Sequence, residues 1–501
     1  MIDLLMSGMA IVFVPKMFIL IVFAVFLGTI FGALPGVSAT MAVTLGIPFT
    51  YKMDPVSAIV CLVATYCASI TGGGMTAILF KIPGVPSSAP TTYDGYPMAQ
   101  RGEAGKALGI QLIVSAIGGM FSAICMLLLS PQLTQAALQF GPAELFAISL
   151  MGLSILSSLD TGNICRTIMS GLLGLVLACI GLDPLLGVPR MTFGTRFFTS
   201  GIEMIPVMIG LFAVTEVLKQ TQKRDKLDAV GGQGKVKTVM PSIRELLSVK
   251  WTILRCSILG TVIGILPGAG ATIAAFMCYS VEQKISKYPE KFGTGIIDGI
   301  AAPETGNNAA TGGSMVPLLS LGIPGGNAAA VMMSALVLKG VVMGPLLLVR
   351  QPEFLTAVFA SMFVSNIIMV FAAIVIAKIF VQILKVPYSI LGPTIIMLAA
   401  IGAFATKNIA IDVILMAIAG VVGFVLVICK LNSSALILGL VLGVICESNL
   451  RRASIIAPGD TLLATLGSIV TRPITGIVLL VCLVVLLNPI LKPLLKKRKV
   501  N

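Results

Sequence analysis

The sequence predicts an all-α polytopic membrane protein, and three observations lead to that prediction. Of the 501 residues, 57% are hydrophobic and 11% are charged, and the mean hydropathy is +1.04. A soluble chain of this length needs much more polar surface. Apolar windows with few charges recur along the whole chain, and paired proline–glycine motifs interrupt some of them. We expect about 10 to 13 transmembrane helices, because each window can cross roughly 30 Å of hydrocarbon.

The predicted spans follow one another from end to end. The clearest apolar windows are Met17–Phe31, Leu112–Leu129, Ser170–Ile180 with its continuation Gly181–Val188, Phe354–Ala377, Ile409–Ile428 and Leu466–Leu491. The 52 glycines and 27 prolines lie largely inside such apolar segments rather than in polar linkers. Membrane helices tolerate these residues where neighbours or water satisfy the freed backbone groups, so the composition indicates broken and closely packed helices.

The two halves of the chain carry the same pair of interrupted motifs. GALPGVSATMA (Gly32–Ala42) and GILPGAGATIA (Gly264–Ala274) are identical at seven of eleven positions, 232 residues apart. A second motif, Gly72–Gly84, recurs at Gly312–Gly325, starting 240 residues later. Broken elements at matching places in two halves are typical of secondary transporters whose binding site lies between the repeats.

The predicted domain organisation follows from these motifs. Residues 1–219 form a first transmembrane repeat with a re-entrant hairpin near 71–92, and residues 250–501 form a second with a hairpin near 306–327. The polar segment 220–249 between them is basic, and the positive-inside rule places it in the cytoplasm. A kink made only for helix packing remains the alternative for each motif. The charge distribution favours inverted over parallel repeats.

Several classes of function are excluded or disfavoured by composition. The net charge of +14 is concentrated beside membrane segments, which indicates topology-setting charge rather than nucleic-acid binding. The chain has no histidine, so triads and metal sites that need one are excluded. Its ten cysteines form no CxxC motif and are expected to be free thiols, and no basic n-region of a signal peptide precedes the first span. No phosphate-binding loop follows GAGAT at Gly268–Thr272, so uphill transport would need an ion gradient.

The motifs resemble those of one transporter family. The matching segments are Gly32–Thr40, Gly72–Gly109, Gly141–Leu153, Gly181–Gly194, Gly264–Thr272, Ala302–Gly325 and Lys339–Pro345. In this order they resemble the large membrane subunit, TctA type, of the tripartite tricarboxylate transporter family. The resemblance implies cation-coupled, secondary-active uptake of organic anions, tri- or dicarboxylates such as citrate, across the bacterial inner membrane. It also implies two partners, a small TctB-type membrane subunit and a periplasmic TctC-type solute-binding protein.

An anionic substrate needs N–H dipoles or cations, which helix N-termini and glycine-rich turns supply without a buried lysine. The residues expected to bind it are Gly36, Gly84, Ser87, Ser88, Thr91, Thr92, Gly268, Gly325, Gly326 and Asn327. An ordinary polar turn after Pro86 is the alternative for Ser87–Thr92. Lys81 is expected to extend to a membrane interface.

The coupling cation, Na⁺ or H⁺, needs oxygen ligands or a protonatable carboxylate near the same breaks. The residues expected to serve it are Ser38, Thr40, Ser69, Thr71, Thr272, Glu304, Asn307, Asn308, Thr311 and Ser314. A buried Glu304 could bind a proton, help to hold sodium or cap a helix. The absence of histidine and the amide and hydroxyl side chains favour sodium. No other cofactor and no catalytic residue is expected.

The remaining charged residues receive structural interpretations. Asp94, in an Asp-Gly pair, is expected in a surface turn, and a gating or docking role is the alternative. Anchoring or salt bridging is expected for Glu144, Asp183, Arg190, Glu203 and Glu216. The alternatives to a carboxylate importer are an ion-coupled carrier of another small solute, a passive channel and an intramembrane enzyme. By analogy with other hairpin-bearing carriers, an elevator-like motion is expected.

Overall fold

The computed structural model describes residues 2–34, 36–159, 164–183, 187–195, 197–222, 238–341, 343–383, 388–457 and 467–498. The first part of the chain forms α1 (Ile2–Val12), α2 (Pro15–Ala33), α3 (Ala39–Thr50), α4 (Pro55–Phe80), α5 (Thr91–Met98), α6 (Ala104–Ala137), α7 (Pro142–Leu159), α8 (Ile164–Ala178), α9 (Met204–Ile209) and α10 (Thr215–Gln222). The rest forms α11 (Ile243–Ser248), α12 (Lys250–Ile265), α13 (Gly270–Ile285), α14 (Ile297–Leu321), α15 (Asn327–Leu338), α16 (Leu347–Arg350), α17 (Pro352–Ile383), α18 (Tyr388–Lys407), α19 (Ala410–Ile428), α20 (Ser433–Ile456) and α22 (Pro473–Arg498).

Short turns and one small sheet connect these helices. The 3₁₀ turns are η1 (Pro86–Ser88), η3 (Phe197–Ser200) and η6 (Pro289–Lys291), and π-type turns η2 (Ala99–Glu103) and η4 (Gly210–Val214) continue into neighbouring helices. Strands β1 (Gly181–Leu182) and β2 (Pro189–Arg190) pair antiparallel. The predicted all-α class is therefore confirmed for the part of the chain that the structure describes.

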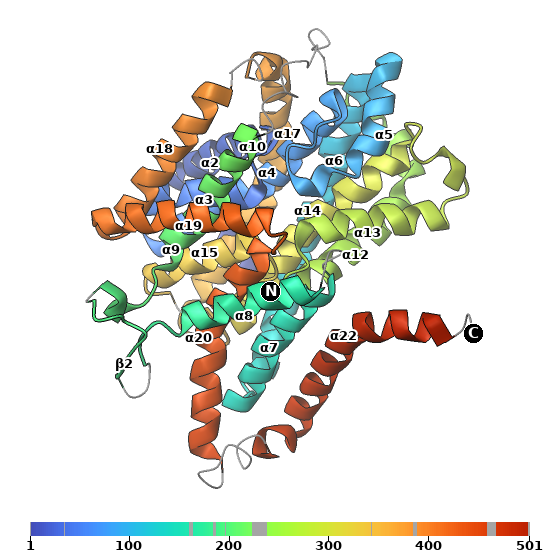
Figure 1. Ribbon diagram of the computed structural model, residues 1–501. Coiled ribbons are helices and arrows are strands. Elements are labelled where there is room, and N and C mark those ends of the chain that lie inside the picture. Colours follow the sequence, from blue (N-terminus) through green and yellow to red (C-terminus); the bar gives the residue numbers. More distant parts are fainter. Residues whose placement is uncertain are drawn as a thin grey trace.

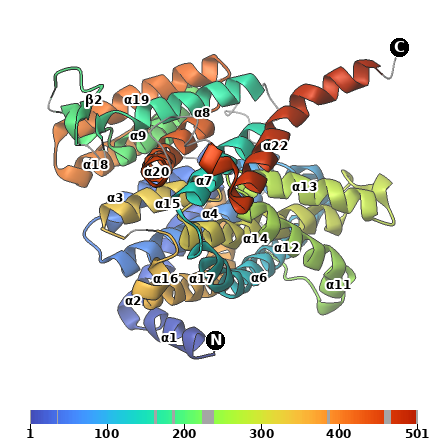
Figure 2. The ribbon, with the colours of Figure 1, turned by 90° about the horizontal axis from the view of Figure 1, so that it is seen from below.

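Helices α4 and α14 form the centre of the molecule. α4 packs on α2, α3 and α17, and α14 packs on α6, α12 and α13. Seen from below, both lie centrally, with α1 and α2 at one edge and α18 and α19 at the opposite edge (Figures 1 and 2). In α4 94% of the apolar window is buried, against 33% in α18 and in α19. The apolar surface of the outer helices is thus available to lipid.

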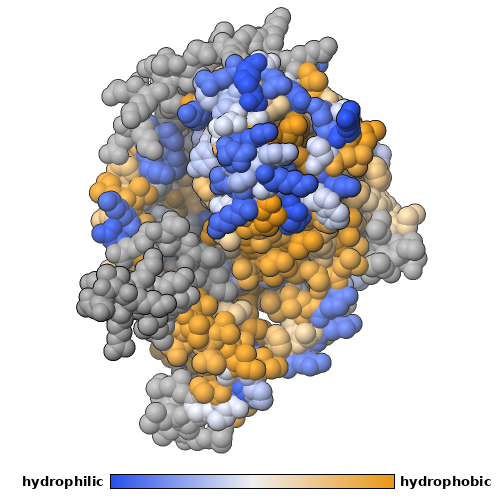
Figure 3. Space-filling model, turned by 90° about the vertical axis from the view of Figure 1, so that its right-hand side faces the viewer, coloured by the Kyte–Doolittle hydropathy of each residue, from blue (hydrophilic) through white to orange (hydrophobic). Residues whose placement is uncertain are grey.

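Eight described helices are long and apolar enough to cross a membrane. Five shorter apolar helices accompany them, among them α3 and α15, so the expected 10 to 13 crossings remain a prediction. Figure 3 shows a continuous apolar band on one face, below a region where hydrophilic residues gather. This distribution supports a multi-pass membrane protein.

Glycines bring the backbones of α2 and α4 into direct contact. A Cβ added at Gly28 would lie 2.4 Å from the carbonyl oxygen of Thr65, and one at Gly32 would lie 2.0 Å from that of Ser69. Helices α12 and α14 meet in the same way, with Gly260 against the Gly306 carbonyl at 2.4 Å. Real Cβ atoms do not come so close to backbone, and small residues are what permit such packing between membrane helices.

The breaks after α2 and α12 have the same backbone. Leu34 and Leu266 end their helices in extended conformation (φ −74°, ψ 121° and φ −72°, ψ 121°), and Gly36 and Gly268 follow at φ +87° and +80°. Glycine adopts these positive φ values without steric cost. Pro35, within the predicted break at Leu34–Gly36, lies outside the described residues.

The breaks after α4 and α14 also correspond. Each helix ends at a left-handed residue, Lys81 (φ 59°) or Gly322 (φ 72°). The Gly84 N–H then donates to the Gly73 carbonyl (3.2 Å), and the Gly325 N–H donates to that of Ser314 (3.4 Å). Since 314 − 73 and 325 − 84 both equal 241, the structural offset agrees with the end of the sequence match (Gly84 and Gly325) and is one residue larger than the 240 at its start (Gly72 and Gly312).

The N-terminal bounds of the two predicted hairpins fall inside long helices. Thr71 and Gly306 both lie inside continuous helices, α4 and α14, and regular helix is interrupted only from Lys81 and from Gly322. Whether these elements re-enter the membrane stays a prediction. Of the predicted linker, 223–237 lies outside the described residues, and Ser242 opens α11 with a capping box.

Candidate functional site

Four helices and one short turn begin at the wall of a single large cavity. The cavity has a volume of about 860 Å³ and is lined at the starts of α3, α13, α15, α20 and η1. Predicted site residues among its lining are Ser38, Thr40, Ser87, Gly268, Thr272, Gly326 and Asn327. The structure thus brings both predicted sets, substrate and cation, partly into one space.

No side chain among the described residues caps the N-terminus of α13 or of α15. Ala269 and Gly326 occupy their N-cap positions, and neither provides a side-chain acceptor. The Gly268 N–H donates to the Gly325 carbonyl (3.1 Å), which joins the two breaks of this half. The first N–H groups of an α-helix lack intrahelical partners and carry partial positive charge. This end of the cavity therefore offers unoccupied donors suited to an anion.

Side chains add polar groups to the same space. Ser87 is 2% exposed and its hydroxyl has no hydrogen-bond partner among the described residues. Leaving a buried polar group unpaired costs about 1–3 kcal/mol, so the position suits a ligand or a water molecule. Asn327 donates to the Ser434 hydroxyl at 2.6 Å, and Asn432 caps α20 by accepting from two backbone N–H groups.

An ion pair on α10 also lines the cavity. The Lys219 ammonium lies 2.6 Å from Oε2 of Glu216, and Gln220 donates to Oε1 of the same carboxylate (3.1 Å). Lys219 is the last residue of the predicted first repeat, and the sequence analysis did not identify it as a site residue. Asn432 and Ser434 were also missed, although an Asn-Ser-Ser run before an apolar segment is a helix-start signal.

A second polar cluster is fully buried between the halves and is centred on Glu304. This carboxylate accepts from Thr91 (2.5 Å), Ser115 (3.2 Å) and Gln111 (3.3 Å), which come from α5 and α6. Glu304 is 0% exposed and, among the described residues, has no basic partner. A buried carboxylate without a countercharge is costly even when it is hydrogen-bonded, and a proton or a bound cation would reduce that cost.

The neighbouring amides extend this cluster to α4. Asn308 donates to Oδ1 of Asn307 (2.8 Å) and accepts from Thr71 (2.9 Å), while Asn307 donates to the Ser87 carbonyl (3.4 Å). The last contact links the cluster to a residue of the cavity wall. Oxygen ligands of this kind suit Na⁺. No group of three His, Cys, Asp or Glu side chains that could hold a metal ion occurs in the described part of the chain.

The other predicted site residues have local roles. A Cβ at Gly84 or Gly325 would lie 2.2 or 2.4 Å from a backbone oxygen of α2 or α12, so both glycines permit close packing. A Cβ at Gly36 would meet the Gln220 side chain at 2.3 Å. Hydroxyls that donate to carbonyls three residues back belong to Ser69, Thr92, Thr311 and Ser314. Ser88 is buried, and its hydroxyl has no partner among the described residues.

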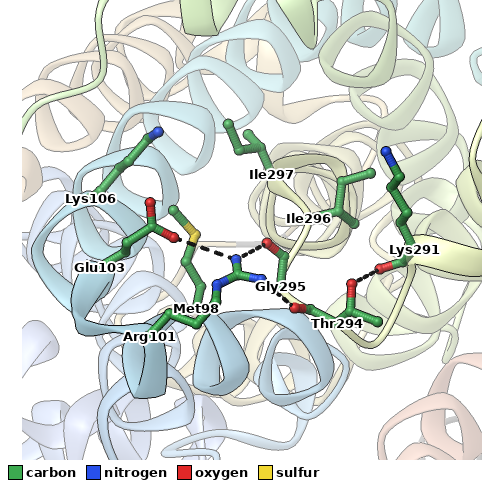
Figure 4. Close-up of a pocket in the computed structure, with 9 residues that line it drawn as sticks. All are labelled: Met98, Arg101, Glu103, Lys106, Lys291, Thr294, Gly295, Ile296 and Ile297. Atoms are coloured by element: carbon green, nitrogen blue, oxygen red, sulfur yellow. Dashed lines mark hydrogen bonds and ion pairs between the residues drawn. The ribbon is translucent and has the colours of Figure 1, made fainter.

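The prediction that Asp94 lies in a surface turn is wrong. Asp94 is 0% exposed in the first turn of α5, where it accepts from the Tyr279 hydroxyl (2.9 Å) and from backbone N–H groups of the α13–α14 connection, Gly295 at 2.8 Å among them. Nearby, Arg101 donates to the carbonyls of Thr294 and Gly295 across a smaller pocket of about 330 Å³ (Figure 4). These contacts fasten α5 and η2 to the second half.

Salt bridging is confirmed for the charged residues that were assigned that role. Arg190 pairs with Glu447, Asp183 with Arg451 (2.5 Å), and Glu144 with Arg472 (3.3 Å). Glu203 pairs with Lys407, and Glu216 with Lys219. Lys81 is exposed and lies over the Tyr96 ring, 5.6 Å from its centroid.

A multi-pass helical protein whose broken helices start around one large cavity has the architecture of a membrane transporter. The comparisons agree, because residues 18–438 match the tripartite tricarboxylate transporter TctA family. The chain belongs to this family.

Two relatives come from Agrobacterium vitis. An uncharacterized 52.8 kDa protein of the TAR-I ttuC' 3' region is 36% identical over 468 residues, covering 93% of this chain and 92% of that protein. An uncharacterized protein of the TAR-II ttuC' 3' region is 40% identical over 233 residues, covering 46% of this chain and 94% of that protein. No solved structure matches this chain.

Proposed function

We propose that this chain is the large permease subunit of a tripartite, binding-protein-dependent importer of organic anions, tri- or dicarboxylates, in the bacterial inner membrane. The observation that carries the proposal is the 860 Å³ cavity, where the uncapped N-termini of α13 and α15 meet the unpaired Ser87 hydroxyl. Carboxylates accept hydrogen bonds from both kinds of donor. Its partners are a small TctB-type membrane subunit and a periplasmic TctC-type binding protein.

The coupling cation is assigned to the cluster around Glu304. A proton or Na⁺ would neutralise this carboxylate, and the Asn307 and Asn308 amide oxygens would complete a sodium site. Asn307 donates to the carbonyl of Ser87, so an ion bound at this cluster would be connected through Asn307 to a residue of the cavity wall. The matching contacts of α2–α4 and α12–α14 support two structural repeats with the site between them.

The test is transport by the complete system in proteoliposomes. The chain is reconstituted with its small membrane subunit, the binding protein is added, and labelled citrate, succinate and propionate are offered under an inward sodium gradient, an inward proton gradient or none. Uptake of a carboxylate above equilibrium only with a gradient is expected. Flux that is independent of any gradient would indicate a channel, and uptake of none of these acids would contradict the proposal.

A further inference from the structure

The substrate cavity contains one pair of opposite charges. Among the described residues that line it, Lys219 is the only basic side chain and Glu216 the only acidic one. They lie one turn apart on α10, with 32% and 23% of their side chains exposed. Because the two charges neutralise each other, the lining formed by the described residues carries no net side-chain charge.

A second donor satisfies Glu216 independently of Lys219. Lys219 contacts Oε2, whereas Gln220 donates to Oε1, and Gln220 itself packs against Gly36 at the first break. If the ammonium moves to another acceptor, the carboxylate keeps one hydrogen bond and is partly hydrated. An ion pair of this exposure contributes little to stability, so another carboxylate can replace it.

We propose that Glu216 occupies the place of a substrate carboxylate, and that a substrate with at least two carboxylates displaces it from Lys219. This inference rests on the proposed function. One carboxylate binds at the N-termini of α13 and α15, and the second pairs with Lys219. A monocarboxylate fills the first place only and leaves the ion pair intact, so Lys219 and Glu216 determine the preference for substrates with several carboxylates.

The test compares the two partners, because competition and simple structural support predict opposite results. The purified full-length chain is titrated with propionate, succinate and citrate, and half-maximal thermal stabilisation gives an apparent affinity for each acid. Lys219→Gln should weaken succinate and citrate by about tenfold and leave propionate unchanged. Glu216→Gln should strengthen both by about threefold, because the internal competitor is gone. Lys219→Arg should retain most of the affinity.

A matched control is available outside the cavity. Lys407→Gln breaks the ion pair between Lys407 and Glu203, and neither of these residues lines the cavity. This variant should leave the titrations with all three acids unchanged. The inference is overturned if Glu216→Gln and Lys219→Gln both weaken succinate, or if Lys219→Gln weakens propionate equally. If the wild-type chain binds none of the acids, the proposed function fails as well. Wild-type binding without the opposite effects overturns the inference alone.

Discussion

The α2–α4 pair and the α12–α14 pair are packed by the same contacts but carry different side chains. At the structural offset of 241, Gly72 corresponds to Gly313, and each lies against a carbonyl of its partner helix, with an added Cβ at 2.4 and 2.3 Å. On the same helices, however, Glu304 and Asn307 of α14 correspond to Val63 and Tyr66 of α4. The backbone geometry is common to both pairs, whereas the buried carboxylate and amide side chains occur on α14 and not on α4.

This difference indicates how one site is built between two helix pairs with similar packing. Close packing at glycines requires a particular backbone and leaves the other faces of each helix free to vary. In the α14 half, those faces carry the carboxylate and the amides. In the other half, Thr71, Thr91 and Gln111 supply the groups that bond to them.

The largest expected effect comes from breaking the shared packing. Gly32→Ala and Gly264→Ala would place a Cβ 2.0 and 2.5 Å from backbone oxygens of Ser69 and Ala310. Each should destabilise the protein by about 1–3 kcal/mol or more, because backbone must move apart. Thermal unfolding and yield of the purified protein measure the loss. Gly467→Ala is the control, since none of the described residues lies within 4 Å of its added Cβ. Loss in only one half would contradict the equivalence of the two pairs.

Glu304→Gln tests the chemistry that only α14 carries. The amide preserves the size of the side chain and removes its charge, so the protein should fold while gradient-driven uptake falls by at least about tenfold, equivalent to 1.36 kcal/mol. Uptake under sodium and proton gradients measures the effect, and substrate exchange without a gradient should be less affected. Retention of full gradient dependence in this variant would place coupling elsewhere.

Ser87→Ala should have a smaller effect, confined to substrate affinity. Ser87 corresponds to Ala328 at the offset of 241, so the variant removes a hydroxyl that only one half supplies. Loss of one hydrogen bond to a charged ligand, about 1.5–3 kcal/mol, should raise the half-saturating carboxylate concentration by about tenfold or more. Ser130→Ala is matched, because this buried hydroxyl also has no partner among the described residues and does not line the cavity. Equal effects of the two variants on affinity would count against Ser87 as a ligand.

The sequence predicted the breaks in the helices better than the side-chain contacts between the two halves. Gly36 and Gly268 were recognisable because a proline–glycine pair at matched places requires a special backbone. Glu304 and Asn307 were recognisable as polar residues in an apolar run. Gln111 and Ser115, which bond to Glu304 from 193 and 189 residues away, were missed, because no local pattern reports such distant contacts.

The one-residue error at the start of the second motif match, where Gly72 was paired with Gly312, has a physical cause. Pairing Gly72 with Gly312 gives more identical residues at the start of the motif. Structural equivalence, however, depends on which residue lies against the backbone of the partner helix. Gly313, not Gly312, faces the Thr261 carbonyl, and Gly312 instead lies against Ser122 of α6. The sequence analysis missed Lys219 for a related reason. Its position on the cavity wall depends on how α10 packs, and its neighbours in sequence do not report that packing.

The smallest expected effect is on stability and concerns the segments that precede α2 and α12. α12 is preceded by α11, whose Glu245 bonds to Lys106 (2.5 Å) and to Ser242, whereas α2 follows Val14 without a side-chain cap. The Lys106 ammonium and the Ser242 donors lower the pKa of Glu245 to about 2. A carboxyl with a lowered folded-state pKa stabilises the protein above its unfolded pKa, about 4.5, and this contribution is lost as the pH falls toward 2. Glu245→Gln should therefore lower the unfolding temperature slightly at pH 7, and the difference from wild type should shrink between pH 4.5 and pH 2. A difference in unfolding temperature that stayed constant over that range would mean that the ionised Glu245 carboxylate does not stabilise the segment before α12.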